Sequence, residues 1–251
     1  MFVIYGRNPV REALLDRRWD MKTLFLAREG RDPHLAEIIA LARERRIPLE
    51  YRDKRAMDEL ASGGVHQGVV GFCSDYGYAD GNALVSETVR SGGILLLLDG
   101  LSDPGNFGAI IRTGYCFGVQ GILIPRDRSV RVTPTVMKAS SGALLQVPVA
   151  SVVNLARTLD GMKDAGFWIY GTDAKEGKAL RSFDFRGPVG IVFGSEDKGI
   201  RPLVRKKCDA FLTVPIARPF DSLNVSVAAG IVLYEICRKR AKSATGTRGP
   251  G

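Results

Sequence analysis

Residues 211–240 read FLTVPIARPFDSLNVSVAAGIVLYEICRKR, a strand, a loop and a long helix in immediate succession. The apolar start predicts a buried strand at residues 211–214, which Pro215 and Pro219 interrupt. We expect the helix to begin at Asp221 or Ser222. Further on, apolar residues recur at helical spacing and predict one face packed on a core: Val225, Val227, Ala228, Ile231, Val232 and Ile236.

Polar residues crowd the start of this predicted helix, namely Ser222, Asn224 and Ser226. Such residues commonly cap a helix, because their side chains accept hydrogen bonds from its free N–H groups. A strand, a loop and a helix N-terminus can also form a pocket for a charged ligand. This stretch alone leaves both interpretations open.

The residues before this stretch predict an open parallel α/β sheet. The continuous apolar run at 94–98 is typical of a strand covered on both faces. Further strands are expected at residues 121–124, 147–149, 167–170 and 189–193, with helices at 108–117, 134–140, 152–165 and 201–207. In such sheets ligands bind outside the carboxyl ends of the strands.

The N-terminal part predicts a separate small domain. Strands expected at residues 2–4, 24–26, 48–51 and 69–73 alternate with helices, which indicates a three-layer α/β domain over residues 1–73. Its loop GGVHQG, residues 63–68, offers His66 and Gln67 as RNA contacts, although an ordinary polar turn explains them equally well. We expect a glycine-rich linker at 74–93 with one helix near 83–90, a second domain at 94–242 and a frayed tail at 243–251.

The net charge of +9 is unevenly distributed along the 251 residues. Residues 1–80 hold 13 Lys/Arg against 13 Asp/Glu, so the whole excess lies beyond them. A basic domain beside a neutral one suggests a polyanionic partner, most often nucleic acid, although it could be simply a soluble basic surface. The basic loop with Arg126, Arg128 and Arg131 supplies candidate RNA contacts.

Several classes of protein are excluded by what the chain lacks. It has no run of 18 apolar residues and no secretory signal at its start, so we expect a cytoplasmic protein. Its four scattered cysteines and two histidines predict neither a disulfide framework nor a metal site. Neither a phosphate-binding loop nor a Ser-His-Asp pattern occurs. An enzyme built this way would work by positioning and electrostatics, with an organic cofactor.

Three loops that follow predicted strands carry unusual polar residues. The first, LDGLSDPGNFGAIIRTGYCFG at 98–118, contains Asn106, which could be only a helix cap. Six residues later Arg112 stands among apolar neighbours, either extending its head to solvent or held there for a purpose. The second, FGSEDKGI at 193–200, places Glu196 where a carboxylate could enter the pocket. The third is the loop before the last helix.

The segments DPGNFGAIIRT, VFGSEDKGI and VPIARPFDSLNVSVAAGI closely resemble, in this order, the three motifs of the SpoU/TrmH family. These proteins are RNA ribose 2′-O-methyltransferases of the SPOUT superfamily, and the resemblance covers about residues 94–240. Residues 1–73, with IYGRNPVREAL and VHQGVV, also resemble the L30e-like RNA-binding domain of one subgroup. That subgroup methylates a guanosine of 23S ribosomal RNA.

The resemblance implies a trefoil knot near the C-terminus, S-adenosyl-L-methionine as cofactor and a homodimer that forms through the methyltransferase domain. By motif position, it implies cofactor binding by Gly194, Val214, Ile216 and Leu223. It likewise implies catalytic roles for Asn106, Arg112, Glu196, Ser222 and Asn224. Two other functions stay open: a transfer-RNA 2′-O-methyltransferase and a non-catalytic RNA-binding ribosome assembly factor.

Overall fold

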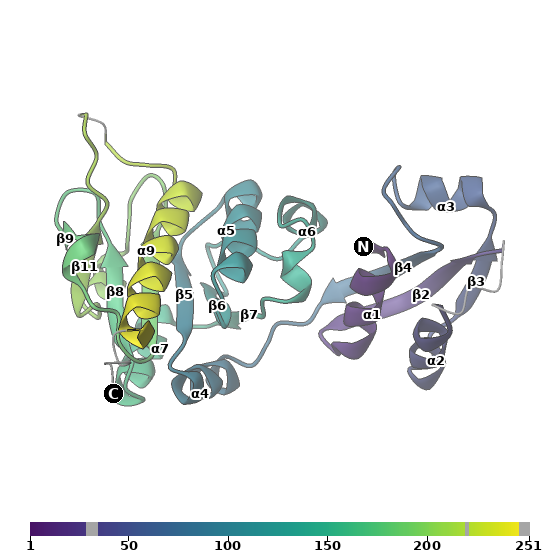
Figure 1. Cartoon of the computed structure of the whole chain (residues 1–251), viewed down its shortest axis with the longest axis horizontal. Helices are drawn as coiled ribbons and strands as arrows, with labels where there is room; N and C mark the ends of the chain where they lie inside the picture. Colours follow the sequence, from purple (N-terminus) through teal and green to yellow (C-terminus); the bar gives the residue numbers. More distant parts are fainter. Residues whose placement is uncertain (29–34, 219–220, 246–251) are drawn as a thin grey trace. The chain divides into compact units, whose positions relative to one another are not determined.

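A computed structural model of the chain describes residues 1–28, 35–218 and 221–245. Contacts divide the chain into two units (Figure 1). The first comprises Met1–Tyr78 with Val132–Met137, and the second Ala79–Arg131 with Lys138–Gly251. Helix α4 (Gly81–Ser91) lies within the predicted linker and confirms the helix expected there. The predicted domain boundaries stay a prediction, and most of the expected tail, residues 246–251, lies outside the described residues.

The described part of the first unit is a four-stranded sheet in the order β1-β4-β2-β3. Strand β4 runs antiparallel to both β1 and β2, and β3 runs parallel to β2. Helix α3 packs on one face through Met57 and Ala61, which contact Phe25 and Val70, and Figure 1 shows α1 and α2 on the other. The elements are β1 (Phe2–Tyr5), α1 (Arg7–Leu15), β2 (Trp19–Ala27), α2 (Ala36–Glu44), β3 (Leu49–Arg52), α3 (Lys54–Leu60) and β4 (Val69–Tyr76). The predicted three-layer arrangement is confirmed.

Strand β2 is longer than the predicted strand at 24–26. It begins at Trp19, whose fully buried ring contacts Phe2 and Tyr76 edge-on. Buried and exposed residues alternate over its first four positions, as in a strand with one covered face. The sequence already contains this alternation, because the charged Asp20 and Lys22 occupy the exposed positions. These charges interrupt the continuous apolar run from which the shorter strand was predicted.

The loop at residues 63–68 is fixed to the start of α1. Gly6, which precedes that helix, has no side chain to cap it, and the Gln67 Oε1 atom accepts the Arg7 N–H at 3.0 Å instead. Gln67 is in the left-handed region, with φ 51°. His66 accepts the Gly68 N–H through Nδ1 at 3.0 Å, and its Nε2 lies 3.1 Å from Asp58. Both predicted RNA contacts thus have structural roles, and RNA contact by either stays a prediction.

Replacing Gln67 by alanine should lower the unfolding free energy by about 0.5–2 kcal/mol, because the first turn of α1 loses its acceptor. Gln67→Glu should retain most of the stability, since a carboxylate also accepts this bond and suits the positive end of the helix dipole. Urea denaturation of the two variants and the wild type measures both effects. Equal stability of all three would show that the interaction contributes nothing.

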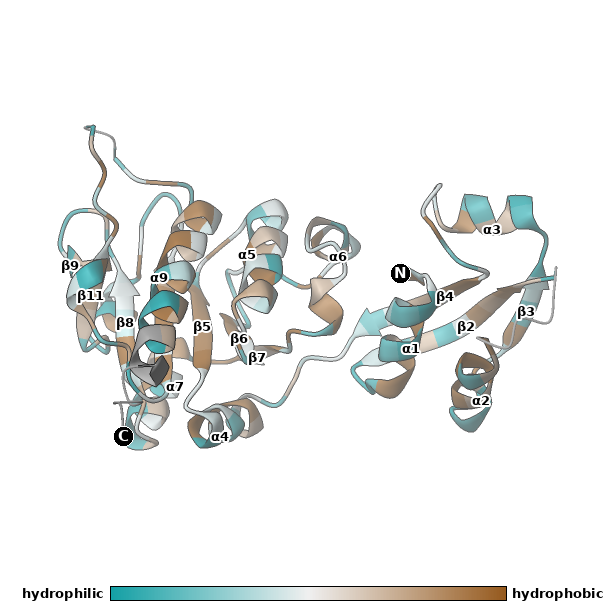
Figure 2. Cartoon of the chain, viewed as in Figure 1, coloured by the Kyte–Doolittle hydropathy of each residue, from teal (hydrophilic) through white to brown (hydrophobic). Residues whose placement is uncertain are grey.

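The described part of the second unit is a seven-stranded parallel sheet in the order β7-β6-β5-β10-β8-β11-β9. Strand β5, the third in this order, is buried along its whole length and shows as a brown ribbon in Figure 2. The strands are β5 (Ile94–Asp99), β6 (Gly121–Pro125), β7 (Val149–Val152), β8 (Trp168–Thr172), β9 (Lys178–Ala179), β10 (Val189–Gly194) and β11 (Ala210–Thr213). The predicted parallel α/β fold is confirmed, although β7 shares only Val149 with the strand expected at 147–149 and the two-residue β9 was not predicted.

The helices of this unit differ from the prediction mainly at their starts. They are α4, α5 (Pro104–Cys116), α7 (Leu155–Asp164), α8 (Pro202–Arg205) and α9 (Val225–Thr245), while α6 (Pro134–Ala139) is divided between the two units. Short 3-10 turns, η2 (Ala143–Leu145) and η3 (Leu180–Ser182), accompany them. Helix α5 begins four residues before the predicted 108, because Asp103 caps it and Pro104 suits a first helical position.

Helix α9 begins at Val225, so the predicted start at Asp221 or Ser222 is wrong. Asn224 caps it instead, since its Oδ1 atom accepts the Ser226 N–H at 2.9 Å. The buried face also differs from the prediction, because Val227 and Ile231 are on the exposed side. The buried residues of this helix are Val225, Ala229, Val232, Leu233 and Ile236.

Two cations fix the C-terminal half of α9. Lys239 Nζ donates to the carbonyl oxygens of Arg181 and Phe183, at 2.6 and 2.5 Å. The Arg240 guanidinium donates to those of Phe185, Gly187 and Gly92, at 3.0, 2.7 and 2.9 Å. Burial lowers the pKa of Arg240 from its ordinary value. These bonds hold the helix against the segment at residues 181–187; the trefoil knot itself stays a prediction.

Candidate active site

Side chains from the three polar loops meet in a chain of hydrogen bonds. Asn106 lies in the first turn of α5, where its N–H donates to the capping Asp103 at 2.6 Å. Its Nδ2 donates to Glu196 Oε1 at 2.8 Å, and its Oδ1 accepts from Asn224 Nδ2 at 3.0 Å. Asn106 is therefore not the helix cap that its position suggested. It links one residue from each of the other two loops.

This meeting follows from the topology of the sheet. Asn106 comes after β5, Glu196 after β10 and Asn224 after β11, all strands of one parallel sheet. Their carboxyl ends therefore share one edge, where ligands of such sheets bind. Glu196 and Asn224 are exposed and Asn106 is half-buried, so the cluster is accessible from solvent.

The loop that carries Glu196 is fixed at both of its ends. Ser195 and Gly199 exchange backbone hydrogen bonds at 3.1 and 2.9 Å and close it into a tight turn. Beyond the turn, Arg201 is held by Asp99, the fully buried last residue of β5. The Asp99 carboxylate accepts the Arg201 backbone N–H at 2.8 Å and its Nε–H at 2.6 Å. Asp99 was not among the predicted site residues, although its place directly after the apolar run at 94–98 was visible.

Gly194 is required by the loop itself. A Cβ atom added at this position would lie 2.1 Å from the Gly199 carbonyl carbon and 2.3 Å from the Ile200 nitrogen. A side chain here would collide with this backbone, and cofactor binding by Gly194 stays a prediction. Close approach of two backbone segments explains the glycine.

Arg112 lies on α5 beyond Asn106 and is exposed. Its Nη1 atom donates to the Ser141 hydroxyl at 3.3 Å. Ser222 is exposed in the loop before α9 and has no hydrogen bond to another residue in the described part of the chain. The structure thus brings together three of the five predicted catalytic residues and leaves Arg112 and Ser222 outside that cluster.

The residues expected to hold the cofactor lie beside backbone N–H and C=O groups that make no hydrogen bond to another described residue. Within residues 215–218 and 221–223, no N–H or C=O group is hydrogen-bonded to another described residue. Ile216 exposes its apolar side chain, and Val214 and Leu223 are half-buried. Free donors and acceptors beside apolar side chains suit an adenosine group, which needs polar contacts at its ring edge and apolar contacts on its faces. The residues present therefore fit S-adenosylmethionine.

The basic loop lies at the same edge of the sheet. Arg126 and Arg128 directly follow β6, whose carboxyl end neighbours that of β5. Both are exposed, as is Arg131, and Arg126 has a long ion pair with Asp127 at 3.9 Å. Three exposed guanidinium groups near the motif loops suit a phosphate backbone.

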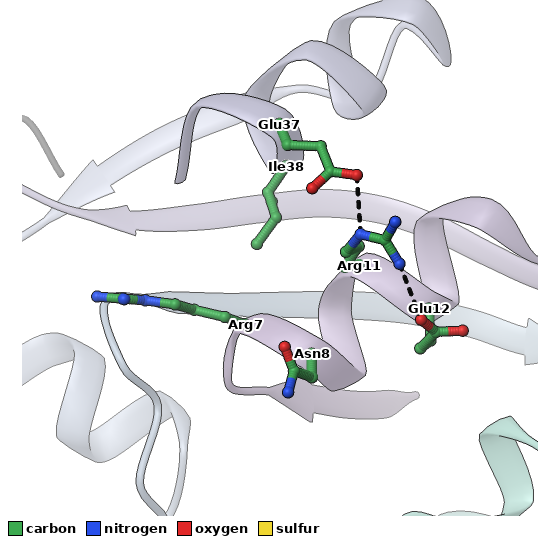
Figure 3. A pocket seen from close by; sticks show the side chains of 6 residues that line it. All are labelled: Arg7, Asn8, Arg11, Glu12, Glu37 and Ile38. Carbon is green, nitrogen blue, oxygen red and sulfur yellow. Dashed lines mark hydrogen bonds and ion pairs between the residues drawn. The ribbon is translucent and has the colours of Figure 1, made fainter. Parts of the chain in front are cut away.

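A pocket of about 450 Å³ lies elsewhere, in the first unit (Figure 3). Its lining comes from α1 and α2: Arg7, Asn8, Arg11, Glu12, Glu37 and Ile38. Arg11 donates to Glu37 at 2.8 Å and to Glu12 at 3.0 Å, and its bond to Glu37 raises the pKa of Arg11. Two carboxylates balance two guanidinium groups here, which makes the pocket a poor site for phosphate.

Among the described residues, no group of three or more His, Cys, Asp or Glu side chains could hold a metal ion. Burial raises the pKa of Cys73 and Cys208 to about 12, so neither forms a nucleophilic thiolate near neutral pH.

No helix in the described part is both long and apolar enough to cross a membrane.

Comparison with known proteins assigns both parts of the chain. Residues 93–234 match the model of the SpoU rRNA methylase family, and residues 3–79 match the model described as RNA 2′-O ribose methyltransferase substrate binding. The chain belongs to the SpoU family. This confirms the resemblance seen in the three motifs, and the protein is an RNA methyltransferase.

Individual SpoU relatives match over nearly the whole chain. The 23S rRNA (guanosine-2′-O-)-methyltransferase RlmB of Pseudomonas aeruginosa is 41% identical over 94% of this chain and 96% of its own length. YacO of Bacillus subtilis, called a TrmH family tRNA/rRNA methyltransferase, is 41% identical over 94% of this chain and 95% of its own. The crystal structure of an AdoMet-bound rRNA methyltransferase from Sinorhizobium meliloti superimposes with a TM-score of 0.77 and 26% identity, covering 94% of this chain and 87% of that one.

Proposed function

We propose that this SpoU enzyme methylates the ribose 2′-hydroxyl of a guanosine in 23S ribosomal RNA, with S-adenosylmethionine as the methyl donor. The hydrogen-bonded cluster of Asn106, Glu196 and Asn224 carries the proposal, because it unites all three motifs at the ligand-binding edge of the sheet. The similarity to RlmB over both domains supports the choice of RNA. A non-catalytic assembly factor would have no need of this cluster.

The reaction is a displacement at the methyl carbon. S-adenosylmethionine would supply an electrophilic methyl group: its bond to sulfur breaks and leaves the electron pair on sulfur, while the ribose 2′-oxygen forms the new bond and gives its proton to solvent, which reaches the exposed cluster. Residues of the chain hold the RNA so that this oxygen is in line. Orientation of this kind can lower a barrier by about 7–11 kcal/mol at best.

Arg112 acts on the reacting ribose in this proposal. Arginine is a poor general base in proteins, which argues against that role for Arg112. It presents several N–H donors in one plane, so it can hold the neighbouring phosphate and stabilise negative charge that develops on the 2′-oxygen. Asn106, Glu196 and Asn224 fix the surrounding loops and the ribose, and Ser222 lies exposed where RNA can reach it.

The two domains divide RNA binding between them. Arg126, Arg128 and Arg131 contribute electrostatic attraction beside the reaction site, where the positive charge of the chain is concentrated. The first domain selects the RNA through the loop at residues 63–68. Gln67 fixes this loop to α1, and Val65 is exposed at its tip. Proteins select RNA mostly by its shape and by unpaired bases.

We also propose a homodimer that forms through α5 and α9. These two helices pack against each other, and their outer surface exposes four large apolar side chains. The exposed fractions are 54% for Tyr115, 50% for Val227, 38% for Ile231 and 58% for Tyr234. A second copy of the chain would cover this surface.

The free cysteines and the RNA substrate fit action in the cytoplasm.

Mapping ribose methylation in cells with and without the gene tests the proposed reaction. One 2′-O-methylguanosine of 23S RNA should disappear from the deletion strain and return when the wild-type gene is restored. The Arg112→Ala gene should not restore it, which separates catalysis from mere presence of the protein. Loss of a transfer-RNA methylation with unchanged 23S RNA would move the enzyme to the other substrate, and no lost methylation at all would contradict both.

A further inference from the structure

We propose that Ser141 is a positioning residue that orients Arg112 toward the reacting ribose. The inference rests on the proposed role of Arg112 in methyl transfer. It starts from the turn between α6 and η2, residues 140–142, which none of the three motifs includes. This turn supplies the hydroxyl to which Arg112 Nη1 donates at 3.3 Å.

The turn reaches Arg112 because α5 carries a glycine at the point of contact. A Cβ atom added to Gly108 would lie 2.4 Å from the Ala139 Cβ and 2.9 Å from the Ser140 nitrogen. Arg112 is four residues beyond Gly108, so both are on the same side of α5. The glycine therefore lets the turn approach the helix closely enough for a serine hydroxyl to meet the guanidinium.

The turn is itself firmly held. Ser140 is fully buried, and its Oγ accepts the Leu144 N–H at 3.4 Å. The Ser141 N–H donates to the Lys138 carbonyl at 3.1 Å, and the three residues of η2 are buried. A hydroxyl on such a turn has a fixed position, whereas an arginine on an exposed helix surface has many rotamers available.

The backbone of Ser141 points to a reason beyond folding. Its φ is 51°, in the left-handed region where glycine is at ease and serine is strained. Glycine would fit the backbone better, but it would not supply the hydroxyl. Strained residues of this sort cluster at functional sites, where the rest of the structure holds them in place. Ser141 engages one donor of the guanidinium and leaves the others for RNA.

The test variant is Ser141→Gly, which removes the hydroxyl and relieves the backbone at once. Its melting temperature should equal or exceed that of the wild type, while kcat should fall about 10- to 100-fold, as expected when a reacting group is misplaced. Cofactor affinity should not change. Ser141→Asn should restore much of kcat, because asparagine tolerates the left-handed region and its amide oxygen accepts a hydrogen bond. The assay uses ribosomal RNA from the deletion strain and S-adenosylmethionine with a labelled methyl group.

Ser62→Gly is the matched control, since Ser62 is an exposed serine with φ 50° in the first unit. It should gain stability in the same way and keep the wild-type kcat. The double variant Arg112→Ala/Ser141→Gly should be no slower than Arg112→Ala alone, because Ser141 acts through Arg112. If Ser141→Gly turns over like the wild type while Arg112→Ala is inactive, the positioning role of Ser141 is wrong and the role of Arg112 is unaffected. Full turnover in Arg112→Ala would overturn the role of Arg112 as well.

Discussion

Replacement of Arg112 by alanine should reduce methyl transfer about 10²- to 10³-fold, the usual loss when one donor to a developing oxyanion is removed. Arg112→Lys should also fail, because a single ammonium group cannot reproduce the planar set of donors. Cofactor affinity should be unchanged in both, since Arg112 is on α5 and the residues expected to hold the cofactor lie at the end of β10 and after β11. Calorimetry with S-adenosylmethionine and single-turnover assays separate the two properties.

Arg157→Ala is the control for lost positive charge, because Arg157 is an exposed arginine on α7, outside the motif loops. It should leave single-turnover rates within about twofold of the wild type, as expected of a surface substitution away from the site. Near-normal turnover in Arg112→Lys would show that only charge matters at this position. Lost cofactor affinity in Arg112→Ala would place the residue in the cofactor site instead.

Replacement of Gly194 by alanine should lower both the methyltransferase activity and the free energy of unfolding. The added methyl group would overlap the backbone at Gly199 and Ile200, and backbone cannot move aside as the end of a side chain can. Overpacking of this kind typically costs about 1–3 kcal/mol. The displaced loop would also carry Glu196 away from Asn106, so methyl transfer should fall even where most molecules remain folded.

Gly161→Ala provides the contrast within the same unit. Gly161 lies inside α7, and an added Cβ atom would meet nothing within 4 Å. Alanine should therefore stabilise the protein by about 0.5–1 kcal/mol through helix propensity. Thermal denaturation and a methylation assay of both variants provide the comparison. If Gly194→Ala were as stable and active as Gly161→Ala, the tight packing of the loop would not matter.

The meeting of Asn106, Glu196 and Asn224 could be predicted, because parallel strands bring the loops after them to one edge of the sheet. The contact between Arg112 and Ser141 could not. It depends on how closely α5 approaches a turn with left-handed backbone, and apolar periodicity does not specify that distance. Spacing pointed to Asn106 as the cap of α5, yet Asp103 three residues earlier is the cap.

Helix α9 shows a second limit of periodicity. Val227 and Ile231 are as apolar as the buried Val232 and Ile236, so the sequence could not show which face packs inward. Three residues before or inside its first turn could each have capped it, and only the hydrogen bonds of Asn224 distinguish them. The exposed apolar face makes sense if a second copy covers it.

The bonds made by Lys239 and Arg240 have a consequence for biosynthesis. Five carbonyl groups, at Gly92 and within residues 181–187, receive their hydrogen bonds from the last part of α9. While the chain is still emerging from the ribosome, those groups have only water as a partner, and the sheet lacks the helix that packs on α5. The catalytic domain can therefore complete its folding only after Arg240 has left the ribosome, and a chain truncated before Lys239 would lack all five of these hydrogen bonds.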